Sequence, residues 1–213
     1  MKEPIIIVDG HIDKIILSRF LPKDVRDRVE FGVANGSTSA LSLARSILSA
    51  NVRPVVLVMD SDTTDDRLIA ERSEMIEYSL REASSGCRYK LVLAIPTIEV
   101  LLVQDERMLG GLTDGHTVQP FEFAYARQTP KQYLQQRFRC DIDYTSCLSS
   151  IVVNLPEDVV FQGEPVGIVK EISEFIRSIP VHEGRPNNGS HTDADQALLH
   201  KPVLSETITE KIQ

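Results

Sequence analysis

Short apolar runs alternate with helix-like segments over the first hundred residues of the chain. Apolar runs at residues 4–8, 29–34, 54–59 and 90–95 have the length and composition of buried strands. The segments between them have helical patterns and lie at residues 11–21, 37–48 and 65–83, with a further helix beginning near residue 97. This strict alternation predicts an α/β fold with a parallel sheet of four or more strands and helices on both faces.

The order of the predicted strands also limits their arrangement in the sheet. Right-handed crossovers leave few topologies, and one of them has the strand order 2-1-3-4. In that order the first and third strands are neighbours at a topological switch point. Ligands of such sheets bind in the crevice outside the carboxyl ends of the strands. We therefore expect any functional site near the ends of the strands at residues 4–8 and 54–59.

The second half of the chain has weaker patterns. We predict that residues 1–103 form the α/β core, that residues 104–180 form a mainly helical extension that completes the domain, and that residues 181–213 are a polar, flexible tail. The elements predicted in the extension are a loop or lid at 104–120, a basic helix at 129–138, a short strand at 151–153 and an amphipathic helix at 166–179.

Composition is consistent with a folded protein of the cytoplasm. The chain has 213 residues, of which 42% are hydrophobic, so that it can bury a large core. The three cysteines show neither metal-ligand nor disulfide-framework spacing, as is usual in a reducing compartment. The apolar run after Met1 is too short for a secretory signal, and no stretch has the length of a membrane span. We expect no membrane association.

Charge changes this picture in one place. The net charge of −8 argues against a broad surface that coats nucleic acid. Residues 124–140 nevertheless contain four basic residues and no acid: Arg127, Lys131, Arg137 and Arg139. This local strip could meet nucleic acid in spite of the net charge, and Lys131 lies near the start of its helix. The alternative is a solvated helical face.

Carboxylates follow two of the predicted strands. Asp9 comes directly after the first strand, and Asp60-Ser61-Asp62 ends the third. If these strands are neighbours about 4.8 Å apart, their acids meet at one edge and repel each other unless a cation lies between them. Asp13 and Glu99 could face the same crevice. Hard oxygen ligands suit Mg²⁺ or Mn²⁺, whereas the alternative is that these acids only form turns and helix caps.

These acidic motifs and their order resemble a Toprim domain, the module shared by topoisomerases, primases and OLD-family nucleases. Asp9-Gly10 and Asp60-Ser61-Asp62 correspond to the acid-Gly and DxD motifs of the family, and Gly36 corresponds to the glycine after its second strand. The spacing Asp9-Gly10-His11-Ile12-Asp13 is similar to that of OLD-type nucleases. The segment Ile95-Pro96-Thr97-Ile98-Glu99 resembles the one in which related Toprim nucleases place another acid. The resemblance covers roughly residues 3–103 and implies a Toprim, Rossmann-like core.

The resemblance implies a metal-dependent nuclease that hydrolyses phosphodiesters, with DNA as the expected substrate. The metal ligands that it implies are Asp9, Asp13, Asp60, Asp62 and Glu99, for Mg²⁺ or Mn²⁺. Asp9, Asp60 and Lys131 are the implied catalytic residues, and Arg127, Lys131, Arg137 and Arg139 are those expected to bind nucleic acid. Related stand-alone proteins suggest an effector of anti-phage defence with a separate ATPase partner, and we also consider a homo-oligomer.

The chain departs from the Toprim pattern at Asp9, where the family usually has glutamate. The side chain of Asp9 is one methylene shorter, which predicts metal binding more firmly than catalysis. Two other functions remain open. Asp60-Ser61-Asp62-Thr63-Thr64 also matches the motif of haloacid-dehalogenase-like phosphatases, in which Asp60 would be the nucleophile and Asp62 the acid or base. A non-catalytic Toprim-like or receiver-like module that binds a partner is the other alternative.

Overall fold

A four-stranded parallel sheet forms the centre of the protein. The structure is a computed structural model, and it describes residues 3–112, 117–140, 142–156 and 167–180. The strands are β1 (Ile5–Val8), β2 (Glu30–Val33), β3 (Val55–Asp60) and β4 (Tyr89–Ala94). They are ordered β2-β1-β3-β4, and all of their pairings are parallel. The predicted α/β class is therefore confirmed, and the order of the strands is one of the few that the sequence allows.

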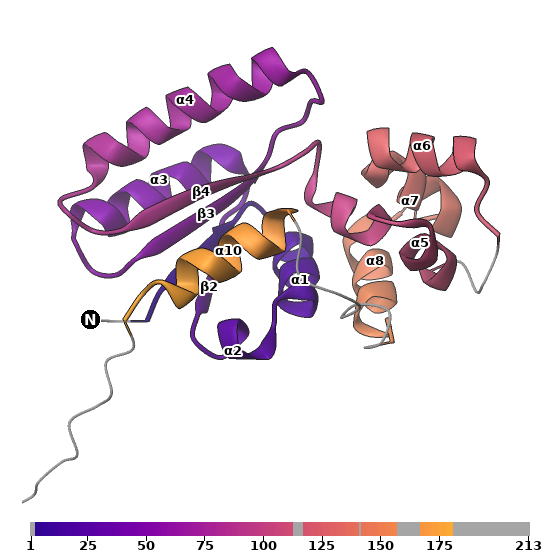
Figure 1. Ribbon diagram of the computed structural model, residues 1–213, viewed down its shortest axis with the longest axis horizontal. Coiled ribbons are helices and arrows are strands. Elements are labelled where there is room, and N and C mark those ends of the chain that lie inside the picture. Colours follow the sequence, from indigo (N-terminus) through magenta and orange to yellow (C-terminus); the bar gives the residue numbers. More distant parts are fainter. Residues whose placement is uncertain (1–2, 113–116, 141, 157–166, 181–213) are drawn as a thin grey trace, which may run out of the picture. The chain divides into compact units, whose positions relative to one another are not determined.

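Helices cover both faces of this sheet (Figure 1). On one face, α1 (His11–Phe20) and α10 (Gly167–Arg177) pack in the cluster that contains Ile6 and Val56, with the short α2 (Lys23–Arg26) beside them. On the other face, α3 (Ser37–Ser49) and α4 (Asp66–Ala83) pack in the cluster that contains Ile7 and Leu57. Successive residues of β1 and β3 thus enter opposite cores, as the two-residue period of a strand requires.

The remaining helices pack on the same side of the sheet as α1. They are η1 (Ile98–Val103), which is a 3₁₀-helix, α5 (Glu106–Leu112), α6 (Pro120–Gln128), α7 (Pro130–Phe138) and α8 (Tyr144–Val153). Their buried side chains, such as Leu102, Leu134 and Leu148, join the hydrophobic cluster of α1 and α10. The predicted helices at 129–138 and 166–179 are confirmed as α7 and α10. The segment near residue 97 is helical as predicted, but it forms a 3₁₀-helix.

The loop predicted at residues 104–120 is wrong for much of its length. Residues 106–112 form α5, because Asp105 accepts a hydrogen bond from the backbone N–H of Met108 (2.7 Å) and caps the turn. Met108, Leu109 and Leu112 are buried on one side of this helix. The Gly110-Gly111 pair is typical of a loop, and for this reason the apolar pattern was not recognised in the sequence. Residues 113–116 lie outside the described residues, and α6 already begins at Pro120.

The strand predicted at residues 151–153 is also wrong, because these residues end the helix α8. Their β-branched side chains favour a strand locally, but two tertiary features favour the helix. Asp143 caps its first turn by accepting from the Ser146 N–H at 3.0 Å, and Leu148 and Val152, four residues apart, are both fully buried. The packing of one helical face thus outweighs the local propensity.

The cysteines contradict the expectation that they form no disulfide. Cys140 and Cys147 are disulfide-bonded, with their Cα atoms 5.7 Å apart. This bond links the residues after α7 to the middle of α8, whereas Cys87 is a free thiol. The spacing of seven residues gave no signal, because the turn that brings the two residues together is set by the packing of the helices.

The chain up to Pro180 is one compact unit, and the tail predicted at 181–213 lies outside the described residues. None of the described helices has both the length and the apolar character that a membrane span requires.

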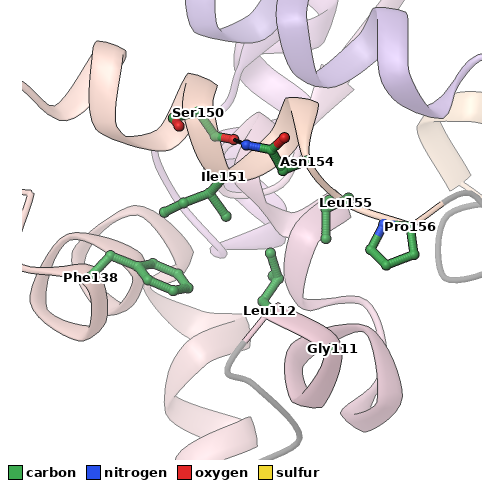
Figure 2. Close-up of a pocket in the computed structure, with 8 residues that line it drawn as sticks. All are labelled: Gly111, Leu112, Phe138, Ser150, Ile151, Asn154, Leu155 and Pro156. Atoms are coloured by element: carbon green, nitrogen blue, oxygen red, sulfur yellow. Dashed lines mark hydrogen bonds between the residues drawn. The ribbon is translucent and has the colours of Figure 1, made fainter.

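The packing of α5, α7 and α8 leaves a pocket of about 350 Å³ (Figure 2). It is lined by Gly111, Leu112, Phe138, Ser150, Ile151, Asn154, Leu155 and Pro156. The amide of Asn154 is engaged, because its Nδ2 donates to the Ser150 carbonyl at 2.8 Å. None of these lining side chains is an acid or a base, so the pocket offers no group for the acid-base or metal chemistry expected at the sheet edge.

Candidate metal centre

Four carboxylates from four different elements gather at the carboxyl ends of β1 and β3. Asp9 directly follows β1, Asp60 is the last residue of β3, Asp13 lies in the first turn of α1, and Glu99 lies in η1. Burial raises the pKa values of Asp13 and Asp60 most, and their neighbours add to this: Glu99 and Asp9 act on Asp13, and Glu99 and Asp13 act on Asp60. The topological switch point of the sheet therefore carries an acidic cluster, which we define as these four residues.

The protein holds each carboxylate of this cluster through one oxygen. The four hydrogen bonds run from Ser37 Oγ to Asp9 Oδ2 (2.5 Å), from Gly10 N–H to Asp13 Oδ2 (2.9 Å), from Ile98 N–H to Asp60 Oδ1 (2.8 Å) and from Tyr144 OH to Glu99 Oε1 (3.0 Å). These donors fix the direction of each side chain but do not neutralise its charge. The arrangement positions negative charge rather than removing it.

The exit of β3 is tied to the loop after β4, which places Glu99 near Asp60. The Ser61 N–H donates to the Ala94 carbonyl (2.8 Å), and the Asp62 N–H donates to the Pro96 carbonyl (2.9 Å). The buried Ser61 hydroxyl donates to the Thr63 carbonyl at 2.7 Å, and the Pro96 carbonyl is a more distant acceptor at 3.3 Å. Ser61 is only 2% exposed, so the serine between the two aspartates has a structural role at this crossing.

Asp62 does not lie with the four carboxylates of the cluster, of which Glu99 is buried and the other three are partly buried. Its backbone has a φ of 57°, which is left-handed, and its side chain is 66% exposed. Asp62 Oδ2 forms an ion pair with the Arg72 guanidinium at 3.1 Å. Its charge still raises the pKa values of Asp9 and Asp60. Asp62 is therefore a residue at the rim of the cluster, and the DxD motif does not direct both carboxylates inward.

Burial and mutual repulsion make the charged forms of these acids costly. Desolvation, followed by the charges of Glu99 and Asp13, raises the pKa of Asp60 to about 8. Desolvation is also the main reason why the pKa of Asp13 rises to about 6. The pKa of Asp9 is raised because its burial outweighs the hydrogen bond from Ser37. A cation among these groups would lower all three pKa values by favouring the ionised carboxylates.

Two oxygens of the cluster are buried without a hydrogen-bond partner among the described residues: Asp9 Oδ1 and Glu99 Oε2. Glu99 is only 2% exposed, so its Oε2 atom is shielded from water and accepts no hydrogen bond in its place. In the described parts of the chain, no three Asp, Glu, His or Cys side chains already converge as metal ligands. The donor set fits Mg²⁺ or Mn²⁺ in its chemistry, and binding requires the carboxylates to approach one another.

Of the four basic residues predicted to bind nucleic acid, Lys131 lies beside the acidic cluster. Its ammonium group is 5.7 Å from the centre of the Tyr144 ring, and its charge lowers the pKa of Asp13. Arg137 is six positions further along α7, which places it about 9 Å along the helix axis. Arg127 lies over the ring of Phe123, 5.9 Å from its centre, and Arg139 follows the end of α7. The structure therefore brings only Lys131 of these four to the acids.

Sequence reasoning missed three side chains that shape the site: Ser37, Arg72 and Tyr144. Ser37 follows the left-handed Gly36 at the start of α3, so the glycine turn after β2 could have indicated it. Arg72 lies two turns into α4, and Tyr144 lies 45 residues after its partner Glu99. Neither Arg72 nor Tyr144 can be recognised from the neighbouring sequence, because each reaches the site only through tertiary packing.

Replacing Tyr144 by phenylalanine should weaken metal binding about 10- to 100-fold, as the loss of a group that orients a metal ligand typically does. The variant keeps the ring and the contact with Lys131 but leaves Glu99 Oε1 without its donor. Isothermal titration with Mn²⁺ would measure the change. Tyr78→Phe, on the exposed surface of α4, is the matched control. Equal affinities in both variants would mean that Tyr144 does not position Glu99 for a metal.

A groove of about 570 Å³ between α3 and α4 borders the acidic cluster. Its lining includes Ser37 and Arg72, the partners of Asp9 and Asp62. The rest of the lining is mostly apolar and includes Leu68 and Met75. A molecule in this groove would therefore lie one side chain away from Asp9. None of the four carboxylates of the cluster lines this groove, which meets the cluster through Ser37.

The comparisons with known proteins add no identity to this geometry: no family model, no curated protein and no solved structure matches the chain.

Proposed function

We propose that this protein is a Toprim-type nuclease that hydrolyses nucleic-acid phosphodiesters with Mg²⁺ or Mn²⁺. One observation carries the proposal: Asp9, Asp13, Asp60 and Glu99 meet at the switch point of a parallel sheet, with two buried oxygens unpartnered and Lys131 beside them. A structural role alone does not account for so many clustered carboxylates, because their repulsion and desolvation destabilise the folded protein. The motifs that resemble Toprim domains lie at these same strand ends.

Each residue has a role in this proposal. Asp9, Asp13, Asp60 and Glu99 hold the metal, and Asp62 adds negative charge at the rim. Ser37 and Tyr144 orient Asp9 and Glu99 by hydrogen bonds at 2.5 and 3.0 Å. Lys131, which is exposed, binds the phosphate next to the bond that breaks. When bound, Mg²⁺ supplies polarisation of the phosphate and a water molecule of lowered pKa.

The phosphatase alternative has less support from the same residues. In that mechanism Asp62 would act as the acid or base beside the nucleophile Asp60. Here Asp62 is turned outward and bound to Arg72. The motif also follows the third strand of the chain, whereas in these phosphatases it normally ends the first strand. The separate ATPase partner, the role in anti-phage defence and the cytoplasmic location remain predictions, as does the possible homo-oligomer.

The purified protein should cleave nucleic acid only when a divalent metal is present. The assay incubates it with labelled DNA and with labelled RNA in Mg²⁺, in Mn²⁺ and in EDTA, and separates the products by gel electrophoresis. The same samples are tested for phosphate release from small phosphomonoesters. Metal-dependent cleavage of DNA or RNA would support the nuclease. Phosphate release without nucleic-acid cleavage would support the phosphatase, and inactivity in both assays would support the non-catalytic module.

A further inference from the structure

The helix α6 exposes two aromatic side chains on one face. Phe121 is 76% exposed and Tyr125 is 40% exposed, and they lie four residues apart, so that they are neighbours on the helix surface. Phe123, the third aromatic residue of this helix, is by contrast partly buried and packs against the core. Two exposed aromatic rings that are neighbours on one helix face indicate a binding surface.

The charges around these rings favour an anionic partner. The ring of Tyr125 lies edge-to-face with that of Tyr133 on α7, with 6.3 Å between their centres, and Arg137 acts on Tyr133 from the same helix. Residues 117–140 carry four basic side chains and a single acid, Glu122. That acid is engaged, because it accepts a hydrogen bond from the Tyr133 hydroxyl at 2.7 Å. This segment is thus locally basic in a chain whose net charge is −8.

This aromatic and basic surface leads to the acidic cluster. Thr129, between α6 and α7, donates both its N–H (3.0 Å) and its hydroxyl (3.1 Å) to the Tyr125 carbonyl. Two residues later, Lys131 lies against Tyr144, the donor to Glu99. Lys131 therefore lies in the first turn of α7, just beyond the turn that follows Tyr125. In Figure 1, α6 and α7 lie together in the helical part of the molecule that follows η1.

We propose that Phe121 and Tyr125 stack against unpaired bases of a single-stranded nucleic acid, whose backbone is held by Lys131 and Arg137. Stacking on exposed rings beside basic side chains is the usual way in which proteins bind single strands. A duplex would not use this surface, because its base faces are already stacked inside the helix. The inference rests on the proposed nuclease function for its biological meaning, and it names the substrate class as single-stranded or locally unpaired nucleic acid.

Binding without metal tests the inference separately from cleavage. Fluorescence anisotropy would compare a labelled single-stranded oligonucleotide with the same sequence as a duplex, in EDTA. We expect the single strand to bind at least 10-fold more tightly. Phe121→Ala and Tyr125→Ala should each weaken that binding roughly 5- to 100-fold, whereas Phe121→Tyr and Tyr125→Phe, which keep the rings, should retain it. Tyr78→Ala on α4, also an exposed tyrosine beside an arginine, should leave binding unchanged.

Equal affinity for single strand and duplex would overturn the inference, as would unchanged binding in both alanine variants. Loss of binding in the ring-keeping variants as well would also overturn it, because that result indicates a packing role. Arg137→Gln provides a test that does not touch the rings, since removing one phosphate contact should lower the salt dependence of single-strand binding by about 0.7 in log-log slope. Single-strand binding without cleavage in metal would leave this inference standing and contradict the nuclease proposal.

Discussion

Replacing Asp60 by asparagine is expected to lower metal-dependent cleavage about 10²- to 10⁴-fold, because the variant removes a central negative charge of the acidic cluster. A metal contributes several kcal/mol to stabilising the transition state, and each 1.4 kcal/mol changes the rate tenfold. Asparagine has nearly the shape of aspartate, and its side-chain oxygen can still accept the hydrogen bond from Ile98 N–H that holds Asp60 Oδ1 at 2.8 Å. The fold should therefore be retained, and initial rates on labelled DNA and RNA would measure the effect.

Two further aspartates make this experiment specific. Asp62→Asn should cause a smaller loss than Asp60→Asn, because Asp62 lies at the rim and is paired with Arg72. Asp66→Asn, an exposed acid at the start of α4, should leave the rate nearly unchanged. Thermal unfolding of each variant would verify that it is folded. Equal rates for the wild type and the Asp60 variant would contradict the proposed site, and equal losses in all three variants would indicate a general effect of charge.

The fold and the position of the site could be predicted from the sequence because both follow from local patterns. Apolar strands of four to six residues alternate with helices, and this alternation restricts the topology to a few options, one of which is the observed order β2-β1-β3-β4. Once β1 and β3 are neighbours, the residues at their ends, Asp9 and Asp60, must lie at one edge of the sheet. An acid that directly follows a buried strand could therefore be assigned to this edge of the sheet from its position in the sequence.

The directions of the side chains and the second layer of the site depend on tertiary packing. Asp62 points away from the cluster because its backbone is left-handed and its N–H is bound to the Pro96 carbonyl. No pattern of two residues in the sequence contains that information. Tyr144 reaches Glu99 from α8, a helix in which the β-branched residues 151–153 suggested a strand. The partner of Cys140 was missed for the same reason. Long-range contacts of the helical extension decide all three features.

The last prediction concerns stability, which should depend on pH and Mg²⁺ together. Asp60 has a pKa of about 8 in the folded protein, whereas its ordinary value is near 3.8. Between these values the folded state holds a proton that the unfolded chain has released, so that a rise in pH favours unfolding. Asp13, with a pKa of about 6, acts in the same direction over a narrower range. In EDTA, the melting temperature should therefore fall as the pH is raised from 5 to 8.5.

Mg²⁺ should reverse this loss, because it replaces the protons as the partner of the carboxylates. At a concentration 100-fold above its dissociation constant, a ligand stabilises the folded state by about 2.7 kcal/mol, which corresponds to roughly 5–10 °C for a chain of this size. The gain should be largest near pH 8.5 and small at pH 5, where protons compete for the acids. Differential scanning calorimetry would measure it, with Asp60→Asn as the control in which both the loss and the gain are reduced. A gain of the same size at both pH values would show that Mg²⁺ binds elsewhere, because a site built from Asp13 and Asp60 must release protons when it takes up a cation.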